Sequence, residues 1–167
     1  MCIRDSFEIW NEPDLGSWTG TSAEYFELYE RTYDAIKSVD PQVPVGGPAT
    51  NHWAKNINYQ QPYGYITNSI ADLSLIGQLI DSTTAWNKPL DFISWHNFNL
   101  EHQTNENAIA YITQKYAGLG SAVPELMVSE WNTPSAIRDT PIQRSYFIKS
   151  LIEMAETLIY VIQHLLE

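Results

Sequence analysis

The sequence has little cysteine, few basic residues and no long hydrophobic run, and each shortage excludes a class of protein. Cys2 is the only cysteine among the 167 residues, which excludes an intramolecular disulfide framework and a cysteine-rich zinc site. Nine Lys and Arg against twenty Asp and Glu give a formal net charge of −11. Because nucleic acids and anionic membrane surfaces bind clustered Lys and Arg, we expect neither as a partner. No run of about 18 apolar residues is present to form a transmembrane helix.

Aromatic residues are abundant by contrast, at 13% of the chain, with six Trp and ten Tyr. The apolar fraction of 44% and the length of the chain suit one folded domain with a sizeable core. The rings admit two interpretations. Composition alone favours an aromatic-rich core over a ring-lined cleft for a flat, hydroxylated ligand.

Short apolar runs of strand length alternate four times with segments of helical periodicity. The predicted strands are residues 7–10, 43–46, 91–96 and 126–129, and the predicted helices are residues 21–40, 66–80, 109–116 and 140–158. This order predicts an α/β fold with a parallel sheet and right-handed connections. A doubly wound sheet and part of a (β/α)8 barrel both fit. No glycine-rich phosphate-binding motif follows a strand, which disfavours a nucleotide-binding version.

Two of the predicted helices begin with the pattern of a capping box, in which a hydroxyl and a carboxylate or amide satisfy free backbone N–H groups. The first box is Thr21–Glu24, and the second is Thr140–Gln143 with Pro141 at the first helical position. Asp40 and Pro41 end the first helix.

Polar side chains follow three of the predicted strands. The first strand ends in Asn11 and Glu12, the third in His96, and the fourth in Glu130. Active sites of α/β folds lie at the carboxyl ends of parallel strands. A carboxyl pair can cleave a glycosidic bond, one group protonating the leaving oxygen while the other attacks the anomeric carbon or activates water. The alternative is that Glu12 and Glu130 are solvated residues that merely follow strands.

Four segments, taken together and in order, resemble glycoside hydrolase family 39, the family of β-xylosidases and α-L-iduronidases. They are FEIWNEPD (residues 7–14), VGGPAT (residues 45–50), DFISWH (residues 91–96) and VSEWNTP (residues 128–134). The resemblance implies a partial (β/α)8 TIM barrel that covers about strands 4–7 and their helices. It further implies a retaining glycoside hydrolase that works by double displacement, most similar to a β-xylosidase acting on plant-type oligosaccharides, with no metal or organic cofactor.

The same resemblance assigns roles to the polar residues at the strand ends. Glu12 would be the general acid/base and Glu130 the nucleophile, with carboxyl groups about 5–5.5 Å apart. Asn11 would hydrogen-bond the sugar hydroxyl next to the anomeric carbon, and His96 would lie near the nucleophile. Because sugar C–H faces pack on aromatic rings, rings in the loops are candidates for substrate binding. These rings belong to Trp18, Trp53, Tyr59, Tyr63 and Trp131.

The chain also departs from the family pattern. A whole (β/α)8 barrel needs about 250 residues, and we expect residues 7–167 to be an incomplete catalytic domain with strands 1–3 absent. Residues 1–6 (MCIRDS) match no family segment and are expected to be a non-native leader. Residues 158–162 are interpreted as either a continued helix or the start of a misplaced strand. Such a polypeptide is expected to be marginally folded and to have little or no activity alone.

Two features bear on the choice of sugar. Phe98 stands where family members commonly carry a Tyr, two places after the histidine, so a hydroxyl near the nucleophile is missing. Few basic residues, chiefly Lys55 and Arg138, follow the strands, which favours a neutral sugar over one bearing a carboxylate. A non-catalytic carbohydrate-binding relative with a degenerate barrel is the alternative, and the presence of both Glu12 and Glu130 in their motifs argues against it.

Overall fold

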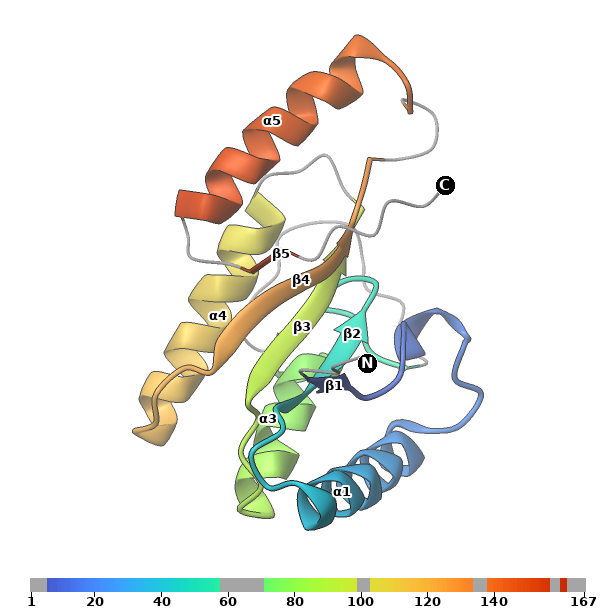
Figure 1. The fold of residues 1–167 in the computed structure, drawn as a ribbon, viewed down its shortest axis with the longest axis vertical. Coiled ribbons are helices and arrows are strands. Elements are labelled where there is room, and N and C mark those ends of the chain that lie inside the picture. Colours follow the sequence, from blue (N-terminus) through green and yellow to red (C-terminus); the bar gives the residue numbers. More distant parts are fainter. Residues whose placement is uncertain (1–5, 58–70, 99–102, 134–137, 157–159, 162–167) are drawn as a thin grey trace.

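The structure is a computed structural model that describes residues 6–57, 71–98, 103–133, 138–156 and 160–161. Strands and helices alternate along the described chain (Figure 1). The strands are β1 (Phe7–Glu8), β2 (Val45–Thr50), β3 (Phe92–Asn97), β4 (Glu125–Trp131) and β5 (Tyr160–Val161). The helices are the 3-10 turn η1 (Pro13–Leu15), α1 (Ser22–Val39), α3 (Leu75–Ala85), α4 (Gln103–Leu119) and α5 (Pro141–Glu156).

The strands form one parallel sheet in the order β1-β2-β3-β4-β5. Right-handed connections between consecutive strands that never reverse direction place the connecting helices on one face of the sheet. A doubly wound sheet requires a reversal of strand order, so this topology excludes it. Figure 1 shows the resulting twisted arc, with α3 and α4 behind β3 and β4. The expected partial (β/α)8 barrel is therefore confirmed.

The sheet contains one more strand than the four that the sequence pattern predicts. Tyr160 and Val161 pair in parallel with Met127 and Val128 of β4. Of the two interpretations of residues 158–162, the described residues support the strand.

The capping box at Thr21 is confirmed and fixes the start of α1. The Thr21 hydroxyl accepts the Glu24 N–H at 3.2 Å, and the Glu24 carboxylate accepts the Thr21 N–H at 2.7 Å. The helix thereby turns Tyr25 and Tyr29 into the core, where both are fully buried. The Tyr25 hydroxyl donates to the Ile9 carbonyl at 2.9 Å, which ties α1 to the chain leaving β1.

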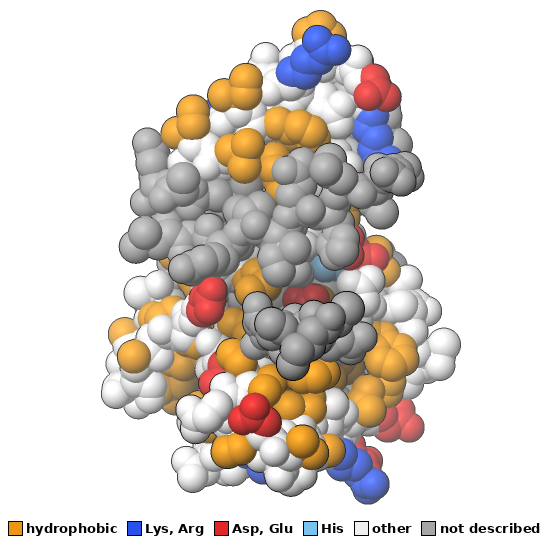
Figure 2. Space-filling model, in the orientation of Figure 1, with side chains coloured by type: hydrophobic (Ala, Val, Ile, Leu, Met, Phe, Trp, Pro, Cys, Tyr) orange, Lys and Arg blue, Asp and Glu red, His pale blue; other side chains and the backbone are white. Residues whose placement is uncertain are grey.

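The second capping box is only half formed. The Thr140 hydroxyl accepts the Gln143 N–H at 3.3 Å, as the pattern predicts. The Gln143 side-chain oxygen accepts the Asp139 N–H, one residue earlier than the box requires. The α5 helix that follows exposes four apolar side chains, Ile142, Ile148, Leu151 and Ile152. Figure 2 shows apolar side chains on the surface of this upper part of the molecule.

The core lies between the sheet and its helices, and β2 and β3 are buried at every position. The β2 strand can approach β3 closely because Gly46 has no side chain. A Cβ at Gly46 would collide with the Phe92 carbonyl and would lie 2.6 Å from the Phe92 ring. Among the described residues, no helix is both long and apolar enough to cross a membrane.

Candidate active site

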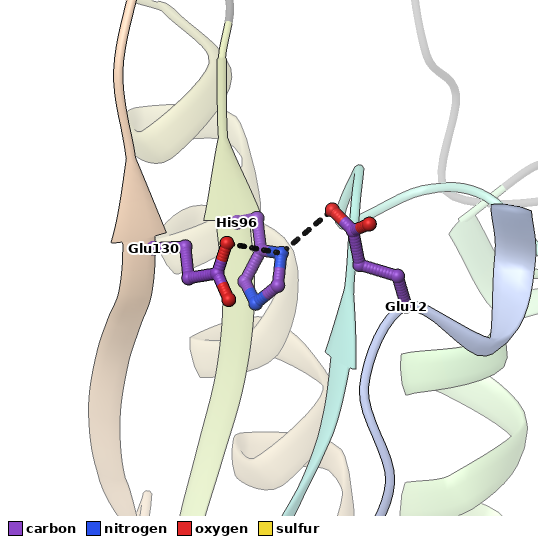
Figure 3. Close-up of side chains that lie close together, drawn as sticks. All are labelled: Glu12, His96 and Glu130. Carbon is purple, nitrogen blue, oxygen red and sulfur yellow. Dashed lines mark hydrogen bonds and ion pairs between the residues drawn. The ribbon is translucent and has the colours of Figure 1, made fainter. Parts of the chain in front are cut away.

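Three functional side chains converge at the carboxyl ends of the strands, as the sequence predicts. Glu12 lies between β1 and η1, His96 lies near the end of β3, and Glu130 lies in β4 (Figure 3). His96 Nδ1 is 2.9 Å from Glu12 Oε1 and 3.9 Å from Glu130 Oε2. One potential ligand atom from each of the three residues falls within 4.8 Å of the others. Two carboxyl groups and an imidazole therefore face one another across a small gap.

A register shift in the sheet brings Glu130 to the same face as His96. Trp95 pairs with Val128, but His96 pairs with Glu130, so β4 has one extra residue at this point. Side chains alternate between the faces of a strand, and one inserted residue reverses that alternation. Without the bulge, Ser129 would stand beside His96.

A second irregularity positions Glu12 from the neighbouring strand. Pro48 pairs with Ser94 and Thr50 with Trp95, which leaves Ala49 as an extra residue near the end of β2. The Ala49 carbonyl accepts the Glu12 N–H at 2.9 Å and so carries the pairing of β1 and β2 past the end of β1.

Glu12 itself adopts a left-handed backbone conformation, with φ 46° and ψ 52°. Such a conformation costs a residue with a side chain about 1–3 kcal/mol and persists only where the surroundings impose it. Ser17 imposes it here, because its hydroxyl lies 2.6 Å from the Asn11 carbonyl and 2.7 Å from the Glu12 carbonyl. Pro13 then starts η1 with a preset φ.

The His96 side chain is fully buried, whereas the Glu12 and Glu130 side chains are 22% and 28% exposed. Its Nδ1 faces both carboxylates, and its Nε2 is buried with no hydrogen-bond partner among the described residues. These contacts assign the proton of a neutral imidazole to Nδ1, which donates to Glu12 Oε1. The two carboxylates remain open to solvent at the mouth of the arc.

The same three side chains are of the types that bind divalent metal ions. A histidine that binds a metal almost always donates its second ring N–H to an acceptor, which fixes the ring. The buried His96 Nε2 has no such acceptor in the described part of the chain. The described residues therefore lack one contact that a metal-bound histidine normally has.

The other residues predicted for the site differ in how exposed they are and in what they contact. Asn11 is exposed directly before Glu12. Trp18 is partly buried, its indole N–H donates to the Thr21 carbonyl at 3.0 Å, and its ring packs edge-on against Trp10 and Tyr25. Tyr59 and Tyr63 lie outside the described residues.

The expectation of open aromatic rings at Trp53 and Trp131 needs correction. Trp53 is 2% exposed and packs 5.8 Å from the Tyr111 ring of α4, and Trp131 is 5% exposed and packs 4.8 Å from Phe147 of α5. Both rings belong to the hydrophobic core. Trp53 follows β2, and Trp131 is the last residue of β4, where it pairs with Asn97. Both side chains pack against the helix layer, so neither ring presents an open face.

The sequence reading missed Asn51, which directly follows β2. Its side-chain N–H donates to Glu12 Oε1 at 2.9 Å, and its backbone N–H donates to Asp14 Oδ1 at 2.8 Å. The rule that identified Glu12, His96 and Glu130, a polar residue at a strand end, applies equally to Asn51. The strand predicted at residues 43–46 ends well before Asn51, so this rule does not select Asn51 from the sequence.

Burial shifts two titratable groups beside Glu12. Desolvation raises the pKa of Asp14, although N–H groups of Asn51, Asp14 and His52 and the Lys55 charge oppose the shift. Desolvation lowers the pKa of His52 to about 4, with a further contribution from Lys55. His52 is therefore neutral near pH 7, and its Nδ1 accepts the Ala54 N–H at 3.2 Å.

Comparison with known proteins adds three findings. The family model described as glycosyl hydrolases family 39 matches residues 3–158. A β-xylosidase of Caldicellulosiruptor saccharolyticus is 31% identical over 168 residues, a match that covers 90% of this chain. A β-xylosidase of Geobacillus stearothermophilus is 56% identical over 45 residues, which cover 26% of this chain. The crystal structure of a monomeric β-xylosidase from Caulobacter crescentus matches 93% of this chain with a TM-score of 0.66 at 22% identity.

This chain spans only part of each of these relatives. The matches cover 30% of the Caldicellulosiruptor protein, 9% of the Geobacillus protein and 32% of the Caulobacter protein. The family-model match over residues 3–158 contains Glu12, His96 and Glu130.

Proposed function

The chain belongs to glycosyl hydrolase family 39, and from this premise we propose that Glu12 and Glu130 are the carboxyl pair of a retaining glycosidase of the β-xylosidase type. The observation that carries the proposal is the convergence of both carboxyl groups on His96. One oxygen of each lies with His96 Nδ1 inside a span of 4.8 Å. Retaining enzymes hold their carboxyl groups about 5–5.5 Å apart and inverting enzymes about 6.5–9.5 Å apart, so the short spacing favours retention.

In the first step, Glu12 would donate a proton to the glycosidic oxygen while Glu130 attacks the anomeric carbon. The bond from that carbon to the leaving oxygen breaks, and a covalent glycosyl ester forms on Glu130. Glu12 is then ionised and would take a proton from water as the water attacks the same carbon. The ester bond breaks, and both carboxyl groups return to their starting states.

His96 would assist by holding the two carboxyl groups in one geometry. Its Nδ1–H binds Glu12 and lies between Glu12 and Glu130 (Figure 3). Burial of the ring keeps this donor in place during the reaction. Asn11, exposed beside Glu12, is available to the sugar hydroxyl next to the anomeric carbon.

A neutral pentoside is the substrate class that we propose. Both sequence relatives are named β-xylosidases. Phe98, rather than a residue with a hydroxyl, packs edge-on against the His96 ring at 5.9 Å. Among the described residues, no Lys or Arg contacts Glu12, His96 or Glu130, so no cation stands ready for a sugar carboxylate.

The experiment uses two proteins. One is the 167-residue chain, and the other is a chimera in which residues 7–156 replace the matching segment of the Caldicellulosiruptor saccharolyticus β-xylosidase. The chimera should hydrolyse an aryl β-xyloside. The chain alone should turn over slowly or not at all, because the described sheet is an arc that leaves β1 and β5 with one unpaired edge each.

Variants of the chimera assign the roles. Glu130→Ala should lower kcat by about 10⁴-fold or more, and Glu12→Gln should lower it by about 10²–10⁴-fold. Glu125→Gln, at the exposed start of the same β4 strand, is the matched control and should keep parental turnover. A folded chimera that binds xyloside without turnover would support the non-catalytic alternative, and full activity of Glu130→Ala would overturn the proposal.

A further inference from the structure

Asn51 gives Glu12 a second hydrogen-bond donor on the oxygen that His96 already contacts. The Asn51 side-chain N–H and His96 Nδ1 each lie 2.9 Å from Glu12 Oε1. Among the described residues, no contact falls on Oε2. An oxygen that accepts two donors is a poor site for a proton, so the acid proton belongs on Oε2. The arrangement thus selects which oxygen of Glu12 faces the bond to be broken.

Asp14 holds Asn51 in the position that this contact requires. Asp14 Oδ1 accepts the Asn51 N–H at 2.8 Å, and Asp14 Oδ2 lies 3.4 Å from the His52 backbone nitrogen. The Glu12 N–H donates to the Ala49 carbonyl from the other side. These three hydrogen bonds join the turn that contains Glu12 and Asp14 to the chain that leaves β2. The two segments lie about 37 residues apart in the sequence.

Burial of Asp14 disfavours its ionised form, and the contacts that the carboxylate accepts offset part of this cost. Desolvation raises the pKa of Asp14, so the folded chain bears a cost for its ionised form. A neutral residue of similar shape would avoid that cost. The two backbone N–H groups that it accepts are those that set Asn51 beside Glu12.

We propose that Asn51 is a positioning residue that orients Glu12 with Oε2 toward the substrate, and that Asp14 fixes Asn51 for this purpose. The proposal rests on the proposed role of Glu12 as the acid/base. It concerns two residues that touch Glu12 or its neighbours rather than the substrate itself.

Carboxyl ¹³C NMR of the 167-residue chain tests the contact without requiring turnover. A donor on Oε1 stabilises the ionised form of Glu12, so loss of the donor in Asn51→Ala should move the protonation midpoint of the Glu12 signal to higher pH, by about 0.5–1 unit. The other titratable groups around Glu12 are His96 from β3, Glu130 from β4, Asp14 from η1 and His52 after β2, and all four are unchanged in this variant.

Asn56→Ala is the matched control, because Asn56 follows the same strand and its side chain donates to the Leu73 carbonyl at 2.7 Å without touching Glu12. Its Glu12 midpoint should equal that of the parent. An unchanged midpoint in a folded Asn51→Ala protein would overturn the proposal, as would an equal shift in Asn56→Ala. A failed glycosidase assay would leave this measurement intact, so the two proposals fail separately.

Asp14 is tested through the Asn51 side-chain amide signal, which should follow the titration of Glu12 in the parent. Asp14→Ala removes the acceptor and should abolish that coupling. Asp14→Asn can still accept the Asn51 N–H and should restore it. Coupling that survives in a folded Asp14→Ala protein would overturn the role of Asp14.

The chimera adds a kinetic test that a purely structural role would not satisfy. A poor leaving group depends on protonation by the acid more than an activated aryl group does. Asn51→Ala should therefore lower kcat about tenfold for an alkyl xyloside and much less for a nitrophenyl xyloside. An equal loss for both substrates would contradict the positioning role.

Discussion

Several residues around the site adopt backbone conformations that residues with side chains seldom take. Trp10, Glu12 and Ala49 have φ values of 75°, 46° and 52°. All three lie near the carboxyl ends of β1 and β2, and the Ala49 carbonyl accepts the Glu12 N–H. Because each such conformation costs about 1–3 kcal/mol, we interpret the cluster as strain that sets the backbone at Glu12 and that the surrounding hydrogen bonds sustain.

His52 makes the stability of the chain depend on pH. Its pKa is lowered to about 4, whereas an unfolded histidine titrates near 6.5. A depressed pKa contributes stability above the unfolded value, and that stability is lost as pH falls from 6.5 toward the folded value. At about 1.4 kcal/mol per pH unit, the loss between pH 6.5 and about 4 is on the order of 3–4 kcal/mol.

Replacement of His52 by Asn should remove this dependence. The Asn side-chain oxygen can accept the Ala54 N–H in place of Nδ1 but does not titrate. Urea unfolding at about pH 7 and about pH 4.5 should show a larger loss of unfolding free energy for the parent than for His52→Asn. Parallel losses in the two proteins would mean that His52 protonates equally in the folded and unfolded states.

For single residues, the local sequence pattern identified some members of the candidate site and missed others for a physical reason. Glu12, His96 and Glu130 could be found because each stands at the end of an apolar run. The contact between Asn51 and Glu12 joins residues 39 positions apart and depends on the true end of β2. Burial of Trp53 against Tyr111 likewise depends on how the loop folds back onto α4.

Among the elements, the β2 strand is sensitive to its composition, because Gly46 lets the backbones of β2 and β3 approach. Gly46→Ala should lower the free energy of unfolding by about 3 kcal/mol or more, since the new Cβ would overlap Phe92. Gly118→Ala in α4 is the control, because no atom lies within 4 Å of a Cβ there. That change should be neutral or stabilising by up to about 1 kcal/mol.

Chemical denaturation of both variants measures the difference. Equal stability of the two variants would mean that the structure relieves the overlap with Phe92 by small shifts, and that this contact does not govern stability.

Sequence pattern predicted which elements exist better than where they begin and end. The capping box at Thr21 defined the start of α1 because its two hydrogen bonds are local. The β2 strand was predicted at residues 43–46 and is observed at Val45–Thr50. Pro44 lies just before this strand and Pro48 lies within it. Because proline is disfavoured within strands, the sequence pattern could not locate the two ends of β2.

Taken as a whole molecule, the described chain is an arc of a barrel, with Glu12, His96 and Glu130 together at the carboxyl ends of its strands. The strictly consecutive strand order follows from four βα repeats, and the order of the family segments predicted it. The two register shifts that turn Glu130 and Ala49 to their places could not be predicted, because alternation along a strand carries no signal of a bulge. Strand alternation thus predicted the edge on which the site lies but not its final geometry.

The central claim, that Glu130 is the nucleophile of a retaining glycosidase, is tested most directly by trapping the covalent intermediate. A 2-deoxy-2-fluoro xyloside with an activated leaving group slows the second step more than it slows formation of the ester. Mass spectrometry of the digested chimera should find one fluoroxylosyl group on the peptide that contains Glu130, and none in Glu130→Gln. A label on Glu12 or any other residue, or hydrolysis with inversion and no label, would contradict the claim.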